Sequence, residues 1–457
     1  MGLGLGLAQR NAFLDKYGAR FVVQSLPSLA ALLVVVDVSA TCRTVVAQIK
    51  AQKKKHTVTP VEVGTLLHRK MLRWHPSAKE VVWVFDSYAD LHSLRHQMYK
   101  TSRYRPATER QLAAVVPERQ VVVGGRIYNR KARPYTPADV AGWEMNTEID
   151  GERVFNSGAA KCRFYELVTE QLICVSAEHP TALVSIIDTM RPSGATNAVV
   201  TVVTSGGDGV TYSERPRSAK HGEADQKIAH LFSTRPDKGA SGVWHTCDCD
   251  SIGQSVCNGL QPRIVFPGPS VVEPSRLPQG QSCAMALLCN GGDYNESMKY
   301  AQVSSENLFE TLASCPSGIT FVELGPAGAT VDVRGIVEFL GAFQPKRRKR
   351  SVYVVEGEEP HKFYRMKPTA AEASSGAKVR QALPTGSMLS HSIADLVRAI
   401  VYWQMGATEN SSDFGMMPEL YTGMARSFRD GSMPTNVENM RESLDPTAEP
   451  VLVRFPI

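Results

Sequence analysis

The run Leu33-Val34-Val35-Val36-Asp37 decides the fold that this sequence predicts. Its apolar residues are typical of a strand that is buried on both faces, and an acid follows at the carboxyl end. Three further apolar runs lead into acids in the same way, and they begin at Val81, Val243 and Ala284. Open α/β sheets place their ligand site at the carboxyl ends of parallel strands. The sequence therefore predicts an α/β fold, with a mainly parallel central sheet flanked by helices.

Seven acids follow these runs or open a helix that is expected to start near residue 223. They are Asp37, Asp86, Glu223, Asp225, Asp248, Asp250 and Asp293. Seven carboxylates can share one cleft at neutral pH only when cations neutralise them. Carboxylate oxygens suit hard divalent cations, so the sequence predicts Mg²⁺ or Mn²⁺. Two such ions about 3.5–4 Å apart can activate a water molecule and stabilise the leaving oxygen of a phosphodiester.

The spacing around Asp248 predicts how this part of the site is built. Side chains alternate between the faces of a strand, so we expect Asp248 and Asp250 to point the same way. An exposed strand end that carries two charges is the alternative. A zinc site formed by His245, Cys247, Cys249 and Cys257 is disfavoured, because their spacing is not that of paired Cys-x₂-Cys units.

Five motifs occur in the order in which they stand in flap endonuclease/XPG-like nucleases. They are VVVDVSA, VVWVFDSYAD, HGEADQKIAHL, HTCDCDSI and CNGGDYNES, within residues 1–105 and about 195–315. The chain thus resembles this 5′ nuclease superfamily, which has a PIN-like fold, and its divergence resembles that of virus-encoded members. The third motif is also similar to one of the 5′-3′ exoribonucleases.

The resemblance implies a metal-dependent, structure-specific 5′ nuclease that acts on DNA or RNA with a 5′ end or junction. It makes all seven acids catalytic and metal-binding, with Asp86, Glu223, Asp225 and Asp248 nearest the metals. Family members also carry a Lys and an Arg seven and fourteen residues after the second aspartate. Those offsets give Ser93 and Lys100 here, so Lys100 is expected to bind phosphate, with Arg95 or Arg103 replacing the missing partner. A solvated basic helix face is the alternative.

One departure from the family pattern favours a rival function. Flap endonucleases grip duplex DNA through glycine-rich turns after the Asp-Tyr motif, and the matching stretch 295–303 contains no glycine. The rival is a structural or scaffold protein, for example one associated with a virion or capsid, that retains a nuclease fold.

The order of motifs predicts four regions. They are an N-terminal nuclease region (1–105), an insertion or cap (106–195), an internal nuclease region (196–345), and a basic linker with a C-terminal extension (346–457). Helices are predicted over 42–49, 61–74, 164–172, 182–190, 223–231, 304–312 and 393–404, and strands over 121–123, 199–203 and 319–322, besides the four apolar runs.

Composition is consistent with an intracellular protein. The net charge is +6, which permits a nucleic-acid partner, and the nine cysteines are odd in number and scattered, as in a reducing compartment. The apolar run Leu29–Val36 is far shorter than the roughly 20 residues of a membrane helix. The basic run Lys346–Arg350 suits a nuclear localisation signal, a nucleic-acid contact or a solvated linker. We expect the nucleus, or alternatively a virus particle, and a protein partner for the C-terminal extension.

Overall fold

The computed structural model describes rather more than half of the chain. The described residues are 18–20, 33–86, 120–123, 126–129, 135–156, 158–178, 184–189, 198–206, 209–217, 224–266, 270–289, 312, 315–325, 328–342, 386–406, 426–429 and 442–454.

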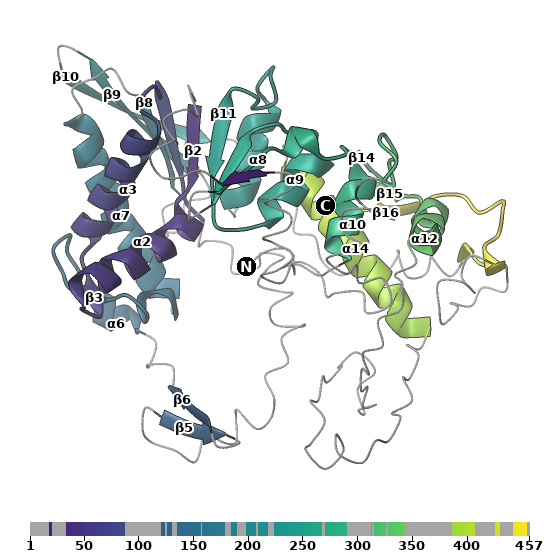
Figure 1. Cartoon of the computed structure of the whole chain (residues 1–457), viewed down its shortest axis with the longest axis horizontal. Helices are drawn as coiled ribbons and strands as arrows, with labels where there is room; N and C mark the ends of the chain where they lie inside the picture. The colour runs from purple at the N-terminus through teal and green to yellow at the C-terminus, as the bar shows by residue number, and fades with distance from the viewer. Residues whose placement is uncertain are drawn as a thin grey trace.

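The core of the protein is a nine-stranded mixed sheet (Figure 1). In sheet order its strands are β1 (Gly18–Arg20), β13 (Ser270–Val272), β12 (Arg263–Phe266), β11 (Gly242–His245), β2 (Leu33–Asp37), β4 (Glu80–Val84), β8 (Val184–Thr189), β9 (Ala198–Gly206) and β10 (Gly209–Arg217). The five central strands, β12 to β8, run parallel, whereas the outer pairings are antiparallel. The predicted α/β class with a mainly parallel central sheet is confirmed.

Helices cover both faces of this sheet. On one face lie α2 (Val38–Lys53), α3 (Pro60–Trp74) and α7 (Gly158–Ala177). On the other lie α8 (Ala224–Ser233), α9 (Asp250–Cys257) and α10 (Gln281–Leu288) (Figure 1). Along β2, Val34 and Val36 face the first group, whereas Val35 faces the second. Every residue of β2 is buried, which is why the strand is a continuous apolar run.

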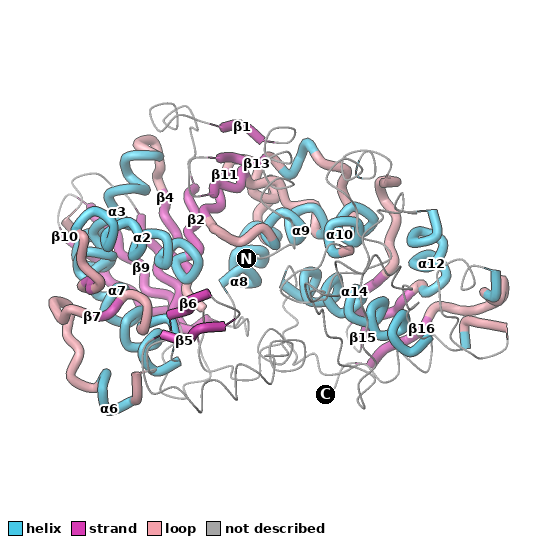
Figure 2. The backbone as a smooth tube through the Cα atoms, turned by 60° about the horizontal axis from the view of Figure 1, so that its bottom comes forward, coloured by secondary structure: helices cyan, strands magenta, loops and turns pink. Residues whose placement is uncertain are grey.

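Smaller elements complete the chain (Figure 2). A three-stranded sheet pairs β14 (Val322–Gly325), β15 (Gly328–Val331) and β16 (Val451–Arg454), and α12 (Val333–Ala342) packs in the same core. Two short ladders join β3 (Thr57–Val58) to β7 (Ile149–Asp150) and β5 (Gln120–Val123) to β6 (Arg126–Asn129). The other elements in the part of the chain that the structure describes are α6 (Pro137–Val140), α14 (Gly386–Gly406) and two 3₁₀ turns, Val154–Asn156 and Pro274–Arg276. Among the described helices, none combines the length and apolar character needed to cross a bilayer.

Helix α14 joins the C-terminal part of the chain to the central sheet's helices. Trp403 is fully buried against α9, where Gly253 leaves room for its ring. Asn258 Nδ2 donates to the Trp403 carbonyl at 2.9 Å, and Gln226 Nε2 of α8 donates to the Tyr402 carbonyl at 3.3 Å. The C-terminal segment therefore supports the two helices, α8 and α9, that also carry predicted site acids.

Most predicted elements are confirmed. The helix over 42–49 lies in α2, 61–74 in α3, 164–172 in α7 and 393–404 in α14; the helix from 223 corresponds to α8, and the strands over 121–123 and 199–203 lie in β5 and β9. Of the strand predicted over 319–322, only Val322 lies in a strand, because β14 begins there. Of the helix predicted over 304–312, only residue 312 is described.

Two predicted elements are wrong. The helix over 182–190 is strand β8, whose β-branched Val184, Ile186 and Ile187 pair with β4 and β9. The apolar run that begins at Ala284 is helix α10, not a strand, and all its residues are buried. A fully buried helix loses the polar face that reveals its period, so a run of Ala, Met and Leu gave no periodic signal.

The domain boundaries stay a prediction, although part of the predicted insertion (106–195) belongs to the central layers. Helix α7 packs beside α3, and β8 pairs with β4 in the main sheet. These two elements are thus built into the core.

The contact between α9 and α14 makes a stability prediction. A Cβ at Gly253 would overlap the six-membered ring of Trp403. Because this ring is enclosed, we expect Gly253→Ala to lower the free energy of unfolding by roughly 1–3 kcal/mol, as overpacking does. Urea unfolding followed by circular dichroism measures the loss.

The matched control is Gly158→Ala at the start of α7, where an added Cβ meets nothing within 4 Å. It should leave stability unchanged or raise it slightly. Equal stability of Gly253→Ala and the wild type would contradict the close packing of Trp403 of α14 against Gly253 of α9.

Candidate functional site

The candidate site lies at the point in the sheet where strands that follow β2 in the chain have been added on both of its sides. From β2 the chain continues outward through β4 and β8, and it later returns to place β11 and β12 on the other side of β2. In open α/β sheets such a switch point leaves a crevice outside the carboxyl ends of the strands. The switch point here falls at the carboxyl ends of β2 and β11.

Asp37 stands at this switch point, as the last residue of β2. Its side chain is buried, and it ends β2 while capping α2 by accepting a hydrogen bond from Ala40 N at 2.9 Å. Its other oxygen accepts from Thr246 Oγ1 at 3.0 Å. Burial, and after it the nearby charges of Asp86 and Asp248, raise the pKa of Asp37 to about 7, although the two hydrogen bonds lower it in part. Asp37 therefore lies within electrostatic reach of two other predicted site acids.

Asp86 connects β4 to both helical layers. Its backbone N–H donates to Ser39 Oγ of α2 at 2.9 Å, and its Oδ1 accepts from Ala224 N at the start of α8 at 3.0 Å. This second bond brings Asp86 to the helix end that carries Asp225.

Asp225 is oriented by α9. Its Oδ2 accepts from the buried Gln254 Nε2 at 2.9 Å, and its Oδ1 accepts from Gln226 N at 2.8 Å. The start of α8 is thus tied to β4 through Asp86 and to α9 through Asp225.

Asp248 and Asp250 do not lie on one strand face, so that prediction is wrong. Strand β11 ends at His245, Asp248 lies in the following loop, and Asp250 is the first residue of α9. Asp248 N donates to Thr246 Oγ1 at 3.0 Å, and Asp250 N donates to Asp248 Oδ1 at 3.1 Å. The chain turns into a helix here because the small, polar Thr and Asp side chains satisfy the backbone donors of the turn.

His245, Cys247 and Cys249 do not share a strand face either, because β11 ends at His245. His245 faces the α3 side of the sheet, where its Nε2 lies 2.6 Å from Nε2 of the buried His75. Cys247 Sγ donates to the Ala40 carbonyl, whereas Cys249 packs in the core under α8 and α9. Burial holds the pKa of His245 well below its ordinary value, and the neighbouring His75 lowers it further. Zinc ligation by these residues is not supported.

Electrostatic interactions or hydrogen bonds between the segments that carry them therefore link five of the predicted acids. They are Asp37, Asp86, Asp225, Asp248 and Asp250. Glu223, Asp293 and the predicted phosphate-binding residues Arg95, Lys100 and Arg103 lie outside the described residues. Within the described ranges, no three or more His, Cys, Asp or Glu side chains form a ready-made metal centre. The donor set is nonetheless hard oxygen. The raised pKa of Asp37 reflects first its burial and then repulsion from Asp86 and Asp248, and a divalent cation would relieve that repulsion.

Sequence reasoning gave no role to three residues that shape this site. Thr246 links Asp37 to the Asp248 loop, and Gln254 holds Asp225. Lys227 is fully buried and donates from Nζ to the Phe85 carbonyl at 2.8 Å. Only Lys227 left a signal, because it lies three residues after Ala224 and next to Ile228, on the apolar face of the predicted helix.

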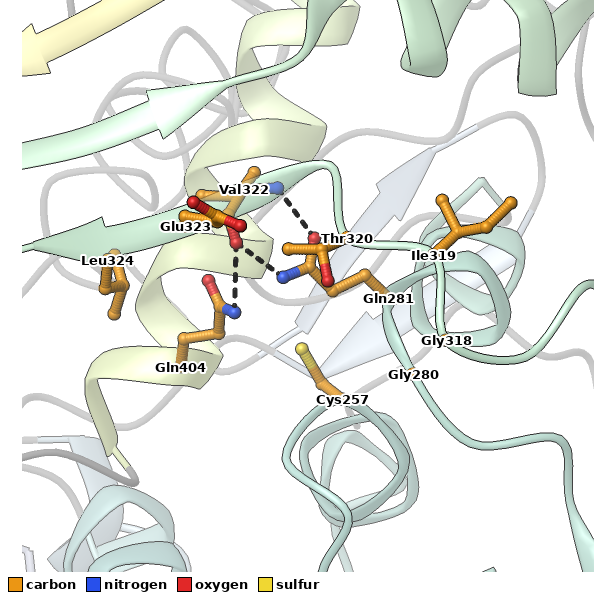
Figure 3. Close-up of a pocket in the computed structure, with 10 residues that line it drawn as sticks. All are labelled: Cys257, Gly280, Gln281, Gly318, Ile319, Thr320, Val322, Glu323, Leu324 and Gln404. Carbon is orange, nitrogen blue, oxygen red and sulfur yellow. Dashed lines mark hydrogen bonds between the residues drawn. The ribbon is translucent and has the colours of Figure 1, made fainter.

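A cavity of about 430 Å³ lies elsewhere, between α9, α10, β14 and α14 (Figure 3). Gln281 Oε1 accepts from the backbone N–H groups of Phe321 and Val322, and its Nε2 donates to the Val322 carbonyl. Gln404 Nε2 donates to the same carbonyl at 3.3 Å. None of the five acids lines the cavity. These amides join β14 to α10 and α14, so we assign the region a structural role.

No protein-family model matches this chain, and no curated protein matches it. The function proposed below therefore depends on the chemistry of the site and the order of the motifs.

The buried Asp37 makes a pH prediction for the metal-free protein. Its pKa is about 7 when folded against an ordinary value of 3.8, so between these values the folded state binds a proton that the unfolded state does not. This contribution to stability is fully present below about pH 4 and is lost as the pH rises through about 7. We expect wild type to lose roughly 2–4 kcal/mol relative to Asp37→Asn between pH 4 and pH 8.

Urea unfolding in EDTA at several pH values measures this difference. Titrating groups that do not interact with Asp37 are common to both proteins and cancel in the comparison, whereas the interactions of Asp37 with Asp86 and Asp248 are part of the measured difference. Parallel pH profiles for wild type and Asp37→Asn would contradict the raised pKa. Asparagine keeps an oxygen that can accept from Ala40 N, so the cap of α2 is retained.

Proposed function

We propose that this protein is a metal-dependent, structure-specific 5′ nuclease of the flap endonuclease/XPG-like superfamily, with a PIN-like core. One observation carries the proposal: acids from the ends of β2 and β4, the loop after β11 and the starts of α8 and α9 are connected at the switch point of the sheet. The reaction is hydrolysis of a phosphodiester bond in DNA or RNA.

The seven predicted acids divide into two groups. Asp86, Asp225 and Asp248, together with Glu223, would hold the metals most directly, and Asp37, Asp250 and Asp293 would act through waters or at the second ion. When bound, two Mg²⁺ or Mn²⁺ ions would lower the pKa of a bound water and stabilise the leaving oxygen.

The protein's own contribution is orientation. Thr246 and Ala40 N fix both oxygens of Asp37, while Ala224 N fixes Asp86. Gln254 fixes one oxygen of Asp225 from α9. Carboxylates restrained in this way lose little conformational freedom when a cation binds, which favours binding over a set of mobile acids.

The segment that follows β4 carries the basic side chains of the proposal. From Asp86 at the site, the sequence continues to Arg95, Lys100 and Arg103. In the proposal these residues bind the phosphate next to the cleaved bond. The net charge of +6 is consistent with a polyanionic substrate.

The first test is cleavage by the double variant Asp248→Asn/Asp250→Asn. Removing two carboxylates from the site should reduce Mg²⁺- or Mn²⁺-dependent cleavage at least roughly 100-fold. The assay uses labelled single-stranded, flapped and duplex DNA and RNA, each with Mg²⁺, Mn²⁺ or EDTA.

Glu144→Gln/Glu152→Gln is the matched control, since it also removes two carboxylates but from exposed positions. It should cleave like the wild type. Metal-dependent cleavage that survives in Asp248→Asn/Asp250→Asn would refute the site. A wild type that cuts no substrate would refute the nuclease and leave the scaffold with a nuclease fold.

The second test is metal-linked stability. Ions that bind only the folded state raise its stability by about 2.7 kcal/mol at 100 times their Kd. We therefore expect millimolar Mg²⁺ or Mn²⁺ to raise the Tm of the wild type by several degrees, and to raise that of Asp248→Asn/Asp250→Asn much less. Differential scanning calorimetry measures both, and the absence of any shift in folded wild type would count against a metal site.

A further inference from the structure

Lys227 is the one lysine in the described ranges whose side chain is fully buried, with 1% of its surface exposed. It stands on the inner face of α8, and its Nζ donates to the Phe85 carbonyl at 2.8 Å. A buried ammonium loses its hydration, which destabilises the folded state unless nearby negative charge compensates. A charged lysine at this position is therefore expected to have anionic neighbours.

The contact of Lys227 lies next to one carboxylate of the candidate site along the chain. Phe85, whose carbonyl accepts from Lys227 Nζ, directly precedes Asp86. Ala224 N also bonds to Asp86, so α8 holds the end of β4 at two points. One of these two points is the amine of a lysine, and the other is the carboxylate of Asp86, whose charge helps to raise the pKa of Asp37.

We propose that Lys227 is a built-in counter-ion, a positioning residue that offsets the repulsion among these carboxylates and keeps β4 and α8 together when no divalent ion is bound. The role rests on the proposed metal site. Its bond to Phe85 alone does not require a charge, since a neutral donor can also bond a carbonyl. The charge is explained by the five acids connected at the same edge of the sheet.

The counter-ion has an opposite effect once metal is present. A fixed ammonium beside the ligands repels an arriving cation, so it stabilises the metal-free protein while weakening metal binding. Lys227→Met keeps the length and apolar stem but removes the charge. We expect it to have a lower Tm than the wild type in EDTA, by several degrees, and a larger rise in Tm on adding MgCl₂ or MnCl₂.

Lys238→Met is the matched control. Lys238 Nζ also donates to a backbone carbonyl, that of Ser233 at 2.8 Å, but its side chain is exposed. This variant should show the metal response of the wild type. A purely structural role for Lys227 predicts instead that Lys227→Met lowers the Tm equally with and without metal, which would overturn the proposal.

A double-mutant cycle with Asp86→Asn separates charge from packing. Asparagine keeps the oxygen that accepts from Ala224 N and removes one negative charge. If Lys227 acts through its charge, Lys227→Met should lower the Tm in EDTA clearly less in the Asp86→Asn background than in the wild type. Equal losses in the two backgrounds would refute a counter-ion.

The cycle stands even if the metal site fails. If Mg²⁺ and Mn²⁺ do not change the Tm of the wild type, the metal site is refuted. The double-mutant cycle in EDTA still decides whether Lys227 offsets the repulsion among the acids. Should Lys227→Met not fold in EDTA, Lys227→Gln replaces it, because glutamine retains an N–H donor while losing the charge. Folding of Lys227→Gln that is independent of both metal and Asp86→Asn would likewise refute the proposal.

Discussion

The mutual repulsion of carboxylates at one edge of the sheet is the constraint on which the rest of the structure depends. Asp37 shows it most directly: burial and the charges of Asp86 and Asp248 raise its pKa to about 7. The same residue ends β2, caps α2 and accepts from Thr246 after β11. The side chain of Asp37 therefore joins the end of β2 to the segment after β11, although burial and nearby charges disfavour its ionised form.

Stability and function oppose each other at such a place. A purely structural protein would be more stable with fewer acids at this edge, because each buried charge adds desolvation and repulsion. The hydrogen bonds from Ala40, Thr246, Ala224 and Gln254 reduce these penalties, but these neutral donors do not remove the charges of the acids. A site held in this state is suited to accept cations, which is the physical basis of the proposed nuclease.

The C-terminal part of the chain contributes to the same site from a distance. Trp403 of α14 fills the space that Gly253 leaves on α9, and the next residue of α9, Gln254, orients Asp225. Gln226 of α8 is bound to the Tyr402 carbonyl. The segment predicted as an extension thus supports the helices that position the acids, so a change in α14 can affect the site without touching it.

The sequence by itself determined the class of fold and which acids to examine. Runs of Val and Leu ending in Asp mark buried parallel strands, and this signal is local. It failed at β8, where pairing with β4 and β9 overrode an apparent helix, and at α10, where burial on all sides removed the period. Only the tertiary structure decided that Asp250 starts a helix, that Thr246 and Gln254 orient acids far along the chain, and that Lys227 lies beside the end of β4. These contacts join residues up to 209 positions apart, and which distant partners meet depends on how the strands are ordered in the sheet, which no local pattern encodes.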